Sequence, residues 1–186
     1  NHPNWKMGKK ISIDSSTMMN KLFEFIEAKK IFNLKKKNIS ILIHPSSFVH
    51  AIVFLNNGLI KLLAHETKLI IPISSALGIN NFLTDNILKK NIIKLNNLNF
   101  SKPNINQFPV LSLIKILPEK STYFETILIT LNDSLVNKYL QGSINYISIQ
   151  KNLIKLIKNP YFKKYYKLKP KNIYDIKNMI SITKSY

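Results

Sequence analysis

Apolar residues near the start of the chain recur at the spacing of a helix. Between Thr17 and Phe32 they form two series with steps of three or four residues: Met18, Leu22 and Phe25, and Met19, Phe23 and Ile26. These series cover most of the helix circumference, so we expect this helix to be buried. Before it, residues 1–10 read as a loop, residues 11–13 as a short strand, and residues 14–17 as a cluster of helix N-cap residue types.

Short apolar runs in the next segment predict strands. They cover residues 39–43, 48–55 and 59–63, and Asn56-Asn57-Gly58 between the last two favours a hairpin turn. A short helix is expected from Pro72 to Leu77. This pattern predicts a partial mixed sheet with helices packed against it.

The second half of the chain has helical patterning. Thr122 and Glu125 have the spacing of a capping box, and an apolar stripe follows, made of Phe124, Leu128, Leu131 and Leu135. Gly142 is a plausible helix stop, and Ile149, Leu153 and Leu156 mark another helix before Pro160. The expected fold class is α+β: a catalytic-domain portion in residues 1–79, a linker rich in Asn and Lys in residues 80–108, and a C-terminal α-helical bundle in residues 109–186.

The charge of the chain invites a nucleic-acid function, but its composition argues against one. The formal net charge is +19, yet all 28 basic residues are Lys, whereas base-edge readout favours Arg. The lysines are scattered and accompany many Asn and Ile, as in an A/T-rich genome. We therefore expect no specific nucleic-acid partner. The lack of Cys excludes disulfides and thiol chemistry, and no apolar run approaches the roughly 20 residues that cross a membrane.

Candidate chemistry is concentrated between residues 14 and 24. Ser15, Asn20 and Lys21 offer a hydroxyl, an amide and an ammonium group near a helix start, which suits a phosphate monoester. Glu24 lies about one turn further along and has the carboxylate oxygens that divalent cations prefer. Spacing alone leaves the alternative open that this is an ordinary capped helix, and a single carboxylate does not make a metal site.

Two strings extend this interpretation. HPNWKMGKKISIDSSTMMNKLFEFIEA closely resembles the HPNWxMGxKIxxDSAxMMNKxxExIEA signature of the 1-deoxy-D-xylulose 5-phosphate reductoisomerase family, and LIHPSSFVHAIV resembles its IHPxSxxHxxV segment. By this resemblance Ser15, Asn20 and Lys21 are substrate phosphate ligands. His2 contacts the substrate, and Glu24 binds both substrate and metal; both are implied to be catalytic.

The resemblance also implies roles outside the phosphate site. Gly8 matches a backbone position beside NADPH, and Trp5 and Met7 lie in a flexible loop that closes over the site. Ser47 and His50 match polar residues near the active site. The implied cofactors are NADPH and a divalent metal, Mg²⁺ or Mn²⁺, and the implied partners are a phosphorylated sugar substrate and a second subunit in a homodimer.

The implied activity is an NADP-dependent conversion of 1-deoxy-D-xylulose 5-phosphate to 2-C-methyl-D-erythritol 4-phosphate, a metal-dependent rearrangement followed by hydride transfer. The chain begins at Asn1 and lacks the family's NADPH-binding turn and Asp-x-Glu pair, so we expect a fragment that is inactive alone. No targeting segment is seen, which suggests a bacterial cytoplasm or a plastid-type compartment. The alternatives are a basic nucleic-acid-binding module and a truncated dimerisation remnant.

The chain departs from the family pattern at several places. The family's GxPDMRxPI segment reads HETKLIIPI here, and Leu22 replaces a common Gly. The NAANE helix motif survives only in residues 130–133, and the similarity thins after Pro170, so we expect the last helix to be shortened or absent.

Overall fold

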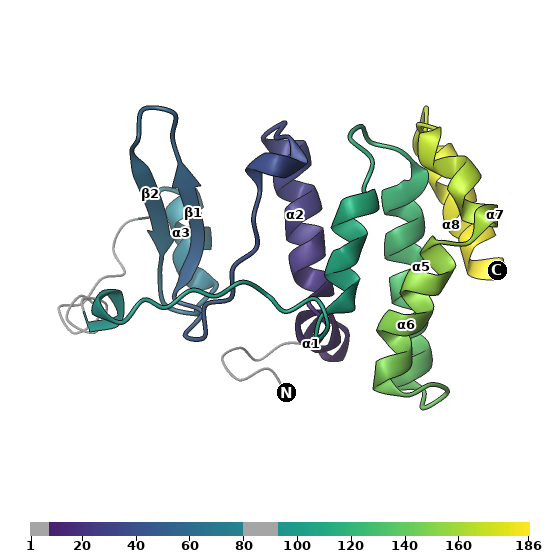
Figure 1. Ribbon diagram of the computed structural model, residues 1–186, viewed down its shortest axis with the longest axis horizontal. Coiled ribbons are helices and arrows are strands. Elements are labelled where there is room, and N and C mark those ends of the chain that lie inside the picture. The colour runs from purple at the N-terminus through teal and green to yellow at the C-terminus, as the bar shows by residue number, and fades with distance from the viewer. Residues whose placement is uncertain (1–7, 80–92) are drawn as a thin grey trace. The chain divides into compact units, whose positions relative to one another are not determined.

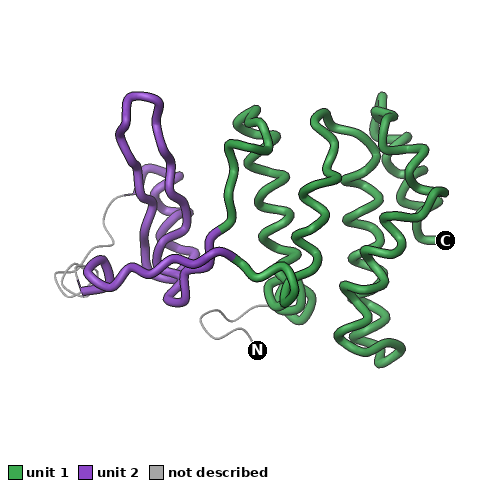
Figure 2. The backbone as a smooth tube through the Cα atoms, in the orientation of Figure 1, with its two compact units in different colours: residues 1–2, 7–41, 103–186 green, residues 3–6, 42–102 purple. Residues whose placement is uncertain are grey.

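The computed structural model describes residues 8–79 and 93–186. The described residues divide into two compact units (Figure 2). The first unit contains residues 8–41 and 103–186, and the second contains residues 42–79 and 93–102. The predicted boundaries at residues 79/80 and 108/109 stay a prediction, because part of the expected linker lies outside the described residues.

The first unit is helical (Figure 1). Its elements are α1 (Lys9–Ser16), α2 (Met19–Ile31), the 3₁₀ helix η1 (Lys36–Asn38), the 3₁₀ helix η2 (Pro109–Ile116), α5 (Tyr123–Leu140), α6 (Tyr146–Ile157), α7 (Pro160–Lys163), the 3₁₀ helix η3 (Lys164–Lys167) and α8 (Ile173–Ser185). Within residues 8–79 and 93–186, no helix combines the length and the apolar character needed to cross a membrane.

Helix α5 organises the core of the first unit. It contacts α1, α6, η3 and α8, and its predicted apolar stripe is buried, with Phe124 and Leu128 fully so. The predicted capping box is confirmed: the Thr122 hydroxyl accepts a hydrogen bond from the Phe124 N–H at 3.1 Å, and the Glu125 carboxylate accepts one from the Thr122 N–H at 3.1 Å. The cap fixes where α5 begins, which in turn fixes which of its faces enters the core.

The second unit contains a β-hairpin and a short helix. Strands β1 (Val49–Phe54) and β2 (Ile60–Ala64) pair antiparallel, and α3 covers Ile70–Ala76. Gly58 adopts a φ of +85° in the hairpin turn, which explains why the turn needs glycine there. The predicted hairpin and short helix are confirmed. Where a mixed sheet was expected, the described residues form an antiparallel pair of strands.

Three predicted elements are wrong. Residues 11–13, predicted as a strand, lie inside α1, which also takes in Lys9 and Lys10 from the predicted loop. Three residues are too few to distinguish the two-residue period of a strand from the 3.6-residue period of a helix, and packing against the other helices decides which one forms. Residues 39–43 contribute only an isolated bridge from Ile43 to Ser101. Helix α8 has 13 residues, so the last helix is neither short nor absent; Asn172 caps it by accepting a hydrogen bond from the Asp175 N–H.

Replacing Leu128 with Ala should lower the free energy of unfolding by about 2–5 kcal/mol, because the side chain is fully buried and leaves a cavity. The matched control is Ile129→Ala on the same helix, where the side chain is 44% exposed and the loss should stay below about 1 kcal/mol. Urea unfolding followed by circular dichroism measures both, and equal losses would contradict the buried face assigned to α5.

Candidate functional site

The candidate site is built on a sharp break between α1 and α2. Met18 adopts a left-handed conformation with a φ of +59°, which an L-residue rarely takes in regular structure. The Thr17 hydroxyl closes the end of α1 by donating to the carbonyls of Ile13, at 3.0 Å, and Asp14, at 3.2 Å. The predicted cluster of N-cap residues therefore ends α1 instead of starting α2. At the start of α2, Met18 supplies no side-chain cap, but the Thr17 hydroxyl accepts a hydrogen bond from the Met19 N–H at 3.4 Å.

The break brings the predicted phosphate ligands together in two pairs. Ser15 is in the last turn of α1, and its hydroxyl accepts a hydrogen bond from the Asn20 side-chain amide at 3.5 Å. Lys21 is in the first turn of α2, and its ammonium group lies 2.7 Å from the Glu24 carboxylate. The two pairs therefore come from the end of α1 and the first two turns of α2, and the backbone N–H groups at a helix start favour an anion.

The Lys21–Glu24 pair is accessible to solvent. The side chains are 46% and 49% exposed, so water screens their attraction and the pair adds little to stability. Both groups can therefore exchange their mutual contact for a ligand at low cost. Among the described residues no three His, Cys, Asp or Glu side chains gather as a metal site requires. Glu24 thus fits a divalent cation only as one ligand of a larger set.

A buried polar contact attaches α1 to α5. Asp14 is 2% exposed, and its carboxylate accepts a hydrogen bond from the side-chain amide of Asn132, which is 1% exposed, at 2.8 Å. Burying a carboxylate is costly unless charge and hydrogen bonds compensate. Lys10, one turn earlier on α1, supplies the charge at 2.7 Å. Since Asp14 directly precedes Ser15, this contact sets where the candidate ligand lies relative to the helical core.

Lys10 connects two carboxylates. Its ammonium group is 2.7 Å from Asp14 and 2.9 Å from Asp133 of α5. Partial burial lowers the pKa of Lys10, but the hydrogen bonds and charges of Asp14 and Asp133 outweigh this, so its pKa is raised above the ordinary lysine value. Lys10 is therefore charged at neutral pH. A second, exposed contact joins α1 to α6, where the Tyr146 hydroxyl donates to the Ser16 hydroxyl at 3.0 Å.

The other predicted site residues lie elsewhere or cannot be placed. Gly8 is the exposed N-cap residue of α1, at the opposite end of that helix from Ser15. With a rise of 1.5 Å per residue, the two are roughly 10 Å apart along the axis. His2, Trp5 and Met7 lie outside the described residues.

Ser47 and His50 belong to the second unit, whereas Ser15 belongs to the first. Ser47 ends a turn with a φ of +51°, and His50 is in β1. The His50 ring stacks on the His65 ring at a centroid distance of 3.8 Å. Their predicted roles near the active site stay a prediction.

Sequence reasoning missed the network around Asp14. Asp14 was interpreted as part of an N-cap cluster, and Asn132 only as a remnant of a motif. A signal was present in the sequence: Asn132 comes four residues after Leu128 and three before Leu135, within the helical spacing of the apolar stripe, and a polar side chain on a buried face must find a partner.

Comparison with known proteins decides the family. Residues 1–32 match a family model described as the 1-deoxy-D-xylulose 5-phosphate reductoisomerase C-terminal domain, and residues 66–186 match one described as the DXP reductoisomerase C-terminal domain. The second match alone covers more than half of the chain. The chain belongs to the 1-deoxy-D-xylulose 5-phosphate reductoisomerase family. The predicted family is therefore confirmed.

Curated reductoisomerases resemble the chain over most of its length. The 1-deoxy-D-xylulose 5-phosphate reductoisomerase of Pelagibacter ubique is 52% identical over 181 residues, which are 96% of this chain and 46% of that protein. The enzyme of Persephonella marina is 40% identical over 147 residues, 78% of this chain and 39% of that protein. The chain thus spans less than half the length of these curated relatives.

Solved reductoisomerases share the fold. A crystal structure of DOX-P reductoisomerase with NADPH, fosmidomycin and magnesium matches with a TM-score of 0.88 and 30% identity, covering all of this chain and 46% of that one. The enzyme from Zymomonas mobilis with NADPH matches with a TM-score of 0.80 and 26% identity, covering 95% and 45%. The predicted α+β class is confirmed: the described residues are rich in helix and include a two-stranded sheet. The comparisons give no support to a nucleic-acid-binding module.

Replacing Asn132 with Leu should lower the free energy of unfolding by about 1–3 kcal/mol, because a buried carboxylate loses a hydrogen-bond donor. Asn137→Leu is the matched control: it is the same substitution at an exposed position of the same helix, so the loss should be below about 0.5 kcal/mol. Combining Asn132→Leu with Asp14→Ala tests the contact itself, since strictly additive losses in urea unfolding would show that the two residues are not coupled.

Proposed function

We propose that this chain is the part of an NADP-dependent reductoisomerase that holds the phosphate of 1-deoxy-D-xylulose 5-phosphate and offers one carboxylate to a divalent metal. The whole enzyme converts this substrate to 2-C-methyl-D-erythritol 4-phosphate in non-mevalonate isoprenoid biosynthesis. The observation that supports the proposal best is the α1–α2 break, where Ser15 and Asn20 lie in contact beside the Lys21–Glu24 pair.

The phosphate grip follows from donors of three kinds. The Ser15 hydroxyl, the Asn20 amide and the Lys21 ammonium group donate to phosphate oxygens. The first turn of α2 adds the backbone N–H groups beyond that of Met19 and the positive end of the helix dipole. These contacts are remote from the reacting carbons. Their role is therefore to position the substrate, and the binding energy they supply is available for orientation.

Glu24 has a different role from these donors. When phosphate engages Lys21, the carboxylate of Glu24 is released from its ion pair and can bind a cation. A bound Mg²⁺ or Mn²⁺ would act as a Lewis acid towards the substrate oxygens during the rearrangement. This chain supplies one carboxylate, so the remaining ligands come from parts of the enzyme beyond these residues.

NADPH supplies the hydride in the second stage of the reaction. Solved relatives are complexes with NADPH and with magnesium, which supports these two cofactors for the whole enzyme. We keep Gly8 as the backbone position beside NADPH, His2 as a catalytic substrate contact, and Trp5 and Met7 as the closing loop. The homodimer and a bacterial cytoplasmic location also stay part of the proposal.

In the whole natural enzyme, Lys21→Ala should raise KM for the substrate about 10- to 100-fold, the equivalent of one charged hydrogen bond, and change kcat less. Glu24→Gln should instead lower metal-dependent kcat by about 100-fold, by analogy with the effect of losing supporting groups in metal sites. The control is Glu27→Gln, an exposed carboxylate on the same helix. Steady-state kinetics measure KM and kcat for all three variants. If Lys21→Ala and Glu24→Gln changed these values no more than Glu27→Gln does, the assigned roles would be refuted.

The 186 residues alone should show no turnover of 1-deoxy-D-xylulose 5-phosphate, because they contribute only one carboxylate to the metal. They should nevertheless retain weak binding of inorganic phosphate at the start of α2, which depends on local groups only. NADPH oxidation measures turnover, and the amide chemical shifts of Asn20 and Lys21 report phosphate binding. Turnover comparable to that of the whole enzyme would contradict this division of roles.

A further inference from the structure

A groove in the first unit collects an unusual share of the lysines. It has a volume of about 930 Å³ and lies at the end of α2, against η1 and the segment that connects η2 to α5. Seven of its eleven lining residues are Lys, whereas Lys accounts for 28 of the 186 residues of the chain. Among the described residues that line the groove, Glu119 is the one acidic residue. Seven ammonium groups and one carboxylate leave six net positive charges around one hollow.

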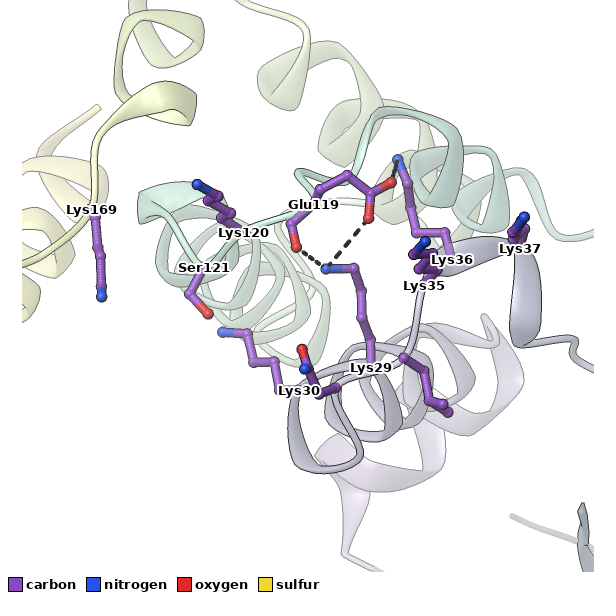
Figure 3. Close-up of a pocket in the computed structure, with 11 residues that line it drawn as sticks. Lys29, Lys30, Lys35, Lys36, Lys37, Glu119, Lys120, Ser121 and Lys169 are labelled. Atoms are coloured by element: carbon purple, nitrogen blue, oxygen red, sulfur yellow. Dashed lines mark hydrogen bonds and ion pairs between the residues drawn. The ribbon is translucent and has the colours of Figure 1, made fainter. Parts of the chain in front are cut away.

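Three of these lysines hold the walls of the groove in place (Figure 3). Lys29, almost fully buried, donates to the backbone carbonyl of Glu119, and Lys36 donates to the carbonyl of Leu117 at 2.7 Å. Lys36 also lies 3.3 Å from the Glu119 carboxylate. Lys30 pairs with the carboxylate of Glu125 at 3.1 Å. The groove is therefore a built feature, since these contacts fix the connecting segment against α2.

The other four lysines form no ion pair with any described carboxylate. They come from three places that are far apart in the sequence. Lys35 directly precedes η1 and Lys37 lies within it, Lys120 precedes α5, and Lys169 precedes α8. Figure 3 shows Lys169 on one side of the view and Lys37 on the other. A drift in codon usage explains why the chain contains many lysines. It does not explain why lysines from separate segments line the same groove.

The lining favours an anion with several charges in a row. In the part of the chain that the structure describes, no aromatic side chain lines the groove to stack on a base, and Leu34 is the one large apolar residue of the lining. Its basic residues are Lys rather than Arg. A Lys ammonium group attracts an anion as a point charge, whereas the planar guanidinium of Arg forms paired hydrogen bonds of defined geometry. The end of α2 opposes an anion with a partial charge of about −0.5, which is small against six net positive charges.

We propose that this groove binds an oligophosphate, either an inorganic phosphate chain or the phosphate tail of a nucleotide. The site is distinct from the one proposed for the substrate, because none of Ser15, Asn20, Lys21 and Glu24 lines the groove. The groove is at the last turn of α2, whereas the substrate donors are at its first. A helix of 13 residues separates the two by roughly 20 Å.

The test is calorimetric titration of the whole natural protein with inorganic tripolyphosphate at 150 mM salt. The triple variant Lys35→Gln, Lys37→Gln and Lys120→Gln should weaken binding at least about tenfold, since each ammonium group removed is a charge-assisted contact. A control triple variant removes the same charge from exposed lysines of α6 and its end: Lys151→Gln, Lys155→Gln and Lys158→Gln. It should change the affinity by less than about twofold.

Two further variants keep the test decisive if the triple variant folds poorly. Lys169→Gln alters a separate exposed segment and should weaken binding on its own, whereas Lys21→Ala should leave it unchanged. ATP binding as tightly as tripolyphosphate would assign the nucleotide tail, and ATP binding much more weakly would assign the inorganic chain. The proposal is overturned if tripolyphosphate does not bind, if the control triple variant loses as much affinity, if Lys21→Ala abolishes binding, or if a single-stranded oligonucleotide binds more tightly.

Discussion

The candidate site depends on one buried hydrogen bond, from the Asn132 amide to the Asp14 carboxylate. A carboxylate with only 2% of its residue surface exposed is unstable unless its partners replace water. Asn132 supplies a hydrogen bond and Lys10 supplies a charge, and both requirements are met from opposite helices. The position of α1 on α5 is thereby specified more narrowly than apolar packing alone would specify it, because hydrogen bonds are directional.

The same contact explains why the unusual backbone at Met18 is tolerated. A left-handed residue between two helices costs free energy and persists only when its surroundings hold it. On one side Asp14 and the Thr17 hydroxyl fix the end of α1, and on the other the buried face of α2 includes Met19 and Leu22. The Thr17 hydroxyl accepts the hydrogen bond of the Met19 N–H, and the other donors in the first turn of α2 remain available for a ligand.

Interactions between residues close in the sequence could be predicted from the sequence, whereas interactions between residues far apart in it could not. The capping box at Thr122 and the hairpin turn at Gly58 depend on residues within a few positions, so the sequence was sufficient for them. The segment from Asp14 to Thr17 shows the limit. Its residue types suit a helix start, but Asp14 is buried by a partner 118 residues away. The sequence predicts Ser15 and Asn20 as ligands of one phosphate, but it does not predict the left-handed turn at Met18 that brings the two side chains into contact.

The distance in sequence between Asp14 and Asn132 also sets an order of events during synthesis. Asn132 emerges from the ribosome 118 residues after Asp14, a delay of roughly 6–24 seconds at about 5–20 residues per second. Until then α1 can pack only on α2, and Asp14 has only its neighbour Lys10 as a partner. The candidate site is thus made before the residue that completes its anchor, so a ribosome that stalls before α5 leaves Asp14 without the Asn132 hydrogen bond.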